Sequence, residues 1–119
     1  INPSTIQGDQ CDAKFGQFTV TQSNVGTATS ELVVVNQTGQ AVTFSGASIT
    51  GTDPGSTAYV PGAITIAPLT SINPNATATV TVTPTNALQT GAYSLTYTLT
   101  YNAGSLTGLT ATGSCRGTI

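Results

Sequence analysis

The chain has 119 residues with a formal net charge of −2 at pH 7, and only 5% of its residues are charged, against about 25% in typical soluble domains. Two basic residues cannot form a phosphate-binding patch, which excludes nucleic acid as a partner. The absence of histidine excludes Ser–His and Cys–His nucleophiles, so we predict no enzyme activity, no cofactor and no metal site. No apolar run approaches the roughly 20 residues that span a membrane.

Residues 1–10, INPSTIQGDQ, predict an extended N-terminal segment that lacks the basic start and apolar core of a signal peptide. After it, alternation of apolar and polar residues with a period of two predicts strands and no helices. The predicted strands are 15–22, 30–36, 41–50, 62–67, 76–83, 92–102 and 106–113.

The clearest strands are ATATVTVT (76–83) and AYSLTYTLTYN (92–102), in which apolar and hydroxyl side chains occupy opposite faces. Threonine suits a pleated strand and keeps the outer face polar without charge. The turn QTGQ (37–40) predicts a hairpin between the second and third strands, and NAGS (102–105) predicts one between the last two. Changes of apolar phase predict β-bulges near Gly46 and Gly108.

Seven short strands separated by Gly, Pro and Asn turns predict an all-β fold. We expect one domain over 1–119, an antiparallel β-sandwich of Ig-like architecture and Greek-key type. Cys11 and Cys115 lie near opposite ends of the chain and form no CxxC unit. A disulfide between them is favoured over two free buried thiols, and this predicts an extracellular location. The bond would close a loop of about 100 residues, which is worth on the order of 4–5 kcal/mol in the chain-entropy model.

Two sequons and one apolar strand are the other candidate sites. NQT at Asn36 and NAT at Asn75 are candidate N-glycosylation sites, and both lie in predicted turns. The strand SELVVVN (30–36) has apolar residues on both faces. Val33 and Val35, in the outward phase, therefore belong either to a covered central strand or to an interface with another molecule.

Two segments of the chain resemble the globular heads of archaeal type IV pilins and archaellin-like proteins. These are TSELVVVNQTGQAVTFSGASITG, which follows an early Cys, and the closing GAYSLTYTLTYNAGSLTGLTATGSCRGTI. The resemblance covers about residues 11–119. It implies an Ig-like head of an extracellular filament subunit, often glycosylated, that polymerises with copies of itself, contacts cell or host surfaces, and has neither enzyme activity nor cofactor.

The chain departs from those pilins at its N-terminus, because nothing like their apolar N-terminal helix precedes Asn2. A head from which that helix has been removed fits the family best, and assembly by another route is the alternative to it. One alternative is a donor-strand filament, in which the terminal segment of one subunit completes the sheet of its neighbour. The residues INPSTIQGDQ offer only Ile1 and Ile6 as apolar anchors for that role. The other alternative is a stand-alone adhesin or surface-layer module that binds carbohydrate or protein.

Overall fold

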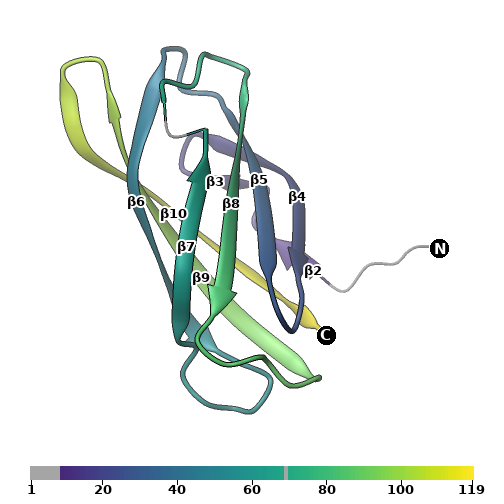
Figure 1. The fold of residues 1–119 in the computed structure, drawn as a ribbon. Coiled ribbons are helices and arrows are strands. Elements are labelled where there is room, and N and C mark those ends of the chain that lie inside the picture. Colours follow the sequence, from purple (N-terminus) through teal and green to yellow (C-terminus); the bar gives the residue numbers. More distant parts are fainter. Residues whose placement is uncertain (1–8, 69) are drawn as a thin grey trace.

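The computed structural model describes residues 9–68 and 70–119, and all regular elements in these ranges are β-strands. The strands are β2 (Asp9–Cys11), β3 (Lys14–Phe15), β4 (Phe18–Val25), β5 (Ser30–Asn36), β6 (Val42–Thr52), β7 (Pro61–Ala67), β8 (Thr77–Pro84), β9 (Ala92–Ala103) and β10 (Leu106–Thr118). They form two antiparallel sheets, ordered β2-β10-β9-β6 and β3-β4-β5-β8-β7 (Figure 1). Within the described ranges there is no helix that is long and apolar enough to cross a membrane. The predicted all-β sandwich is confirmed.

The number of strands is nine in the described residues, where the sequence predicted about seven. The predicted strand 15–22 divides into β3 and β4, because Gly16 adopts φ +62° and starts a two-residue turn that pairs Phe15 with Phe18. The other addition is the three-residue strand β2, which pairs with the end of β10. A strand this short shows no periodicity, so only its long-range partner reveals it.

The predicted hairpin at QTGQ is wrong. Strand β5 is paired on one edge with β4 and on the other with β8, so neither edge is free to take β6. The chain instead crosses to the other sheet, where β6 pairs with β9. The predicted hairpin at NAGS is confirmed, since Ala103 pairs with Leu106 and Gly104 supplies a φ of +60° at the turn.

Both predicted bulges are present. The β6–β9 register shifts between Phe44 and Gly46, and the β9–β10 register shifts between Leu106 and Leu109, where Gly108 has φ +68°. Further shifts, at Val20/Gln22 in β4 and Pro61/Ala63 in β7, have no counterpart in the sequence analysis.

The core lies between the sheets and is built from the inward phase of each strand. The Tyr and Leu residues of β9 from Tyr93 to Tyr101 are all buried, as are Ala78, Val80 and Val82 of β8. The ring of Phe18 meets Tyr101 edge-on at 4.9 Å and Phe44 at 5.1 Å between centroids. Such aromatic pairs add specific geometry to the burial of apolar area.

Candidate interaction surfaces

The disulfide joins Cys11 of β2 to Cys115 of β10, with the two Cα atoms 3.9 Å apart. The two residues are direct partners in the antiparallel ladder, so the bond lies within one sheet and does not connect the two sheets. Cys115 is fully buried, and the Ser23 hydroxyl of the opposite sheet lies 3.8 Å from its Sγ atom. The Asp12 carboxylate accepts a hydrogen bond from the Ser114 N–H at 3.0 Å, so Asp12 also helps to hold the end of β2 against β10.

Asn36 is the last residue of β5 and is only 1% exposed, so its predicted position in an exposed turn is wrong. Its Nδ2 group donates to the carbonyl oxygens of Gln40 (2.8 Å) and Ile72 (2.9 Å). Its Oδ1 atom accepts from the N–H of Thr38 (2.9 Å) and from the Thr38 hydroxyl (2.7 Å). Both amide hydrogens are therefore used inside the fold, and a glycan on Nδ2 would break this network.

Asn75, the other sequon residue, is exposed in the turn that leads into β8. It has φ +67°, a left-handed conformation that Asn tolerates better than most residues. The fold brings the two sequons together, because the Asn75 N–H donates to the carbonyl oxygen of Asn36 at 2.8 Å. In the folded domain only the Asn75 side chain is in a position to carry a glycan, and its glycosylation stays a prediction.

Val33 and Val35 lie on the outer face of the five-stranded sheet, where both are half-buried. Their cross-strand neighbours are polar: Val33 lies opposite Gln22 and Thr79, and Val35 opposite Thr19 and Thr77. Strand β5 is central in its sheet, which was one of the two explanations for its apolar residues on both faces. Both valines are partly covered by the side chains that flank them. Their role as an interface stays a prediction.

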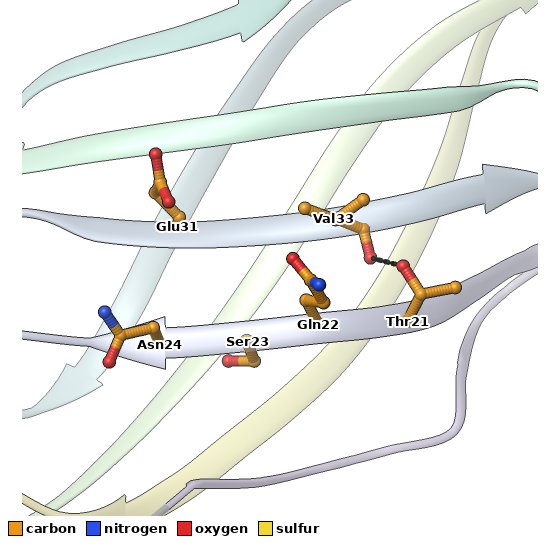
Figure 2. Close-up of a pocket in the computed structure, with 6 residues that line it drawn as sticks. All are labelled: Thr21, Gln22, Ser23, Asn24, Glu31 and Val33. Atoms are coloured by element: carbon orange, nitrogen blue, oxygen red, sulfur yellow. Dashed lines mark hydrogen bonds between the residues drawn. The ribbon is translucent and has the colours of Figure 1, made fainter.

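A shallow polar concavity of about 350 Å³ adjoins Val33 on the same face. Figure 2 shows the carboxylate of Glu31 on β5 and the amides of Gln22 and Asn24 on β4 around it. Thr21 lies in the β4 bulge and lines this site, and its hydroxyl donates to the Val33 carbonyl oxygen at 3.3 Å. The sequence analysis missed this cluster, since it depends on register between two strands.

The outer face of the four-stranded sheet is covered by hydroxyl groups. Cross-strand rows place Ser48, Thr98 and Thr112 side by side, and Thr50, Thr96 and Ser114 in the next row. The Thr96 and Ser114 hydroxyls are 3.2 Å apart, so neighbouring strands share hydrogen bonds across this face. Neither row contains a charged residue, and on the same face Arg116 lies two residues after Ser114 on β10.

The polar groups on these surfaces can bind another molecule through hydrogen bonds. Glu31 is the sole carboxylate lining the concavity, whereas acid–base hydrolysis of a glycoside requires two carboxylates. In residues 9–68 and 70–119 no group of three His, Cys, Asp or Glu side chains is placed to hold a metal ion. A carboxylate and two amides beside an apolar side chain suit the hydroxyls of a sugar or a polar peptide.

Comparisons with protein-family models, with curated proteins and with solved structures found no match to this chain.

Proposed function

We propose that this domain is a structural, non-enzymatic subunit of an extracellular, pilus-like filament, of the kind that its resemblance to archaeal pilin heads implies. The observation that carries the proposal is the composition of the two outer sheet faces. Among the strand residues whose side chains are described, the only charged ones are Lys14, Glu31 and Arg116. Surfaces rich in threonine stay hydrated without the mutual repulsion that charge would create between stacked copies.

The disulfide supports an extracellular location, because persistent disulfides form mainly in oxidising compartments. It anchors β2, which follows residues 1–8 in the sequence, to β10. Force transmitted along a filament through residues 1–8 would otherwise act on a three-residue strand that no covalent bond ties to its sheet.

A concentration series of the oxidised protein tests the proposal, with light scattering and negative-stain electron microscopy as readouts. We expect polymers at low concentration, and a polymer mass that changes little with ionic strength, because exposed charges that salt could screen are few. A strictly monomeric protein at all concentrations would contradict the proposal.

The second candidate function is a module that binds carbohydrate, as in an adhesin. The observation that favours it is the concavity with Glu31, Gln22 and Asn24 (Figure 2). Binding to a panel of immobilised glycans tests it, with Gln22→Ala as the altered site and Thr112→Ala on the other sheet as control. Saturable binding by a monomer, lost in Gln22→Ala alone, would favour this function over the filament.

A further inference from the structure

An apolar groove of about 350 Å³ lies between the outer edges of β6 and β7. Phe44 and Ala47 of β6 and Ile64 and Ile66 of β7 provide its apolar lining. Ala47 and Ile64 are only half-buried, so this part of the core is accessible from outside the sandwich.

Both strands beside the groove have an unpaired edge. Strand β6 is the last strand of its sheet and β7 the last of the other, in the part of the chain that the structure describes. The two ends of the β6 edge are closed by single bridges, from Val42 to Ile72 and from Thr52 to Ala58. The Gly51 carbonyl oxygen accepts the Tyr59 N–H at 2.9 Å, so the stretch 43–50 remains open to an added strand.

The charged residues are distributed unevenly between the two sides of the sandwich. Four of the six belong to the opposite side: Asp9 in β2, Asp12 in the following loop, Lys14 in β3 and Arg116 in β10. Strands β6 and β7 contain none. Edge strands are commonly protected from pairing with another chain by charges, proline or bulges. Strands β6 and β7 have bulges and β7 begins at Pro61, but neither strand carries a charge, and Asp53 lies beyond the end of β6.

We propose that this groove is the acceptor site for residues 1–8 of a second copy, which add as a strand to the open edge of β6. The proposal rests on the filament function proposed above and specifies its contact. Each described strand already pairs within a sheet of its own molecule, which leaves residues 1–8 of a second copy as the candidate added strand. Residues 1–8 carry no charge, and their extended length of about 26 Å suits the open stretch of β6.

The positions of donor and acceptor determine the form of the assembly. Residues 1–8 lead into β2, which lies at the opposite edge of the sheet from β6 (Figure 1). Contacts between two different surfaces of identical subunits produce rings or open chains. Alternation along the segment places Ser4, Ile6 and Gly8 on one face, and Ile6 is the side chain that enters the groove.

Two charge substitutions and a matched control test this site in the full chain. Ala47→Lys places a charge in the acceptor, Ile6→Lys places one on the donor, and Thr112→Lys adds the same charge to the exposed outer face of β10. We expect the first two to reduce polymer mass by roughly tenfold or more, because an unpaired charge would be buried in the contact. Thr112→Lys should polymerise like the parent protein.

Mixing the two altered proteins separates a lost contact from a misfolded variant. The Ile6→Lys protein retains an intact groove and the Ala47→Lys protein an intact donor, so the mixture should form heterodimers that cannot grow. In the heterodimer, hydrogen exchange should slow at those amides of 43–50 that face the open edge of β6 rather than β9. The absence of heterodimers would overturn the inference.

Different results would contradict the acceptor groove and the filament function. Filaments that form equally well from the Ala47→Lys and Ile6→Lys proteins would overturn the acceptor groove and leave the filament function standing. Loss with Ala47→Lys but not with Ile6→Lys would overturn residues 1–8 as the occupant. A parent protein that never polymerises would overturn both.

Discussion

At the scale of single residues, Asn36 shows how a buried amide organises three segments. Its side chain connects the end of β5 to the loop before β6 and to Ile72. Replacing Asn36 with Ala removes four hydrogen bonds of a buried amide, including the acceptor of the Thr38 N–H, and we expect a loss of about 2–3 kcal/mol in the free energy of unfolding. Chemical denaturation measures it. Asn86→Ala, the same change in an exposed loop, is the control and should stay within about 0.5 kcal/mol; equal effects would contradict this role.

A second residue-scale prediction concerns Gly113, which lies beneath the ring of Phe15. A Cβ atom at this position would come far inside van der Waals contact with three ring carbons. Phe15 is also held by Tyr97 at 5.9 Å between centroids, so its ring has little freedom to move. We expect Gly113→Ala to destabilise the domain by about 1–3 kcal/mol through overpacking.

The matched control is Gly46→Ala, because a Cβ atom there meets nothing within 4 Å. Its melting temperature should stay close to that of the parent, while the Gly113→Ala protein melts at a lower temperature. Unchanged melting of Gly113→Ala would show that the Phe15 ring is displaced without cost.

At the scale of elements, the disulfide decides whether β2 stays on its sheet. The bond spans 104 residues of sequence, and closing a loop of this size restricts the unfolded chain by about 4–5 kcal/mol in the chain-entropy model. We expect reduction, or the double replacement of Cys11 and Cys115 by Ala, to lower unfolding stability by that order. Guanidinium titration with and without reductant measures it, and coincident curves would contradict the prediction.

At the scale of the whole molecule, we expect the free energy of unfolding to fall at two ends of the pH range, one acidic and one alkaline. Hydrogen bonds to Asp53, above all from the Thr57 hydroxyl, lower the pKa of its carboxyl below the ordinary 3.8. This stabilisation is complete above 3.8 and is lost as the pH falls through the lowered pKa. Burial raises the pKa of Tyr59 above 10.0. Above 10.0 the unfolded chain ionises first, so stability declines as the pH rises through the raised pKa.

Unfolding titrations across this range should therefore show a plateau between the acidic and the alkaline decline. The Tyr59 hydroxyl has no hydrogen-bond partner among the residues that the structure describes. Tyr59→Phe removes the buried group that ionises, and we expect the alkaline decline to be smaller in this protein. An identical alkaline decline would assign it to other groups.

Apart from β2 and the division of β3 from β4, the sequence by itself determined the strands, together with their inner faces, the bulges at Gly46 and Gly108, and the pairing of Cys11 with Cys115. These features depend on local periodicity, on glycine's access to positive φ, and on there being two cysteines. Only the tertiary structure decided that β5 has both edges filled, which sends β6 to the other sheet and buries Asn36. It also decided which edges stay open at β6 and β7, and which side chains gather around Glu31. Those outcomes depend on register and pairing between strands distant in sequence, and a local pattern carries no information about either.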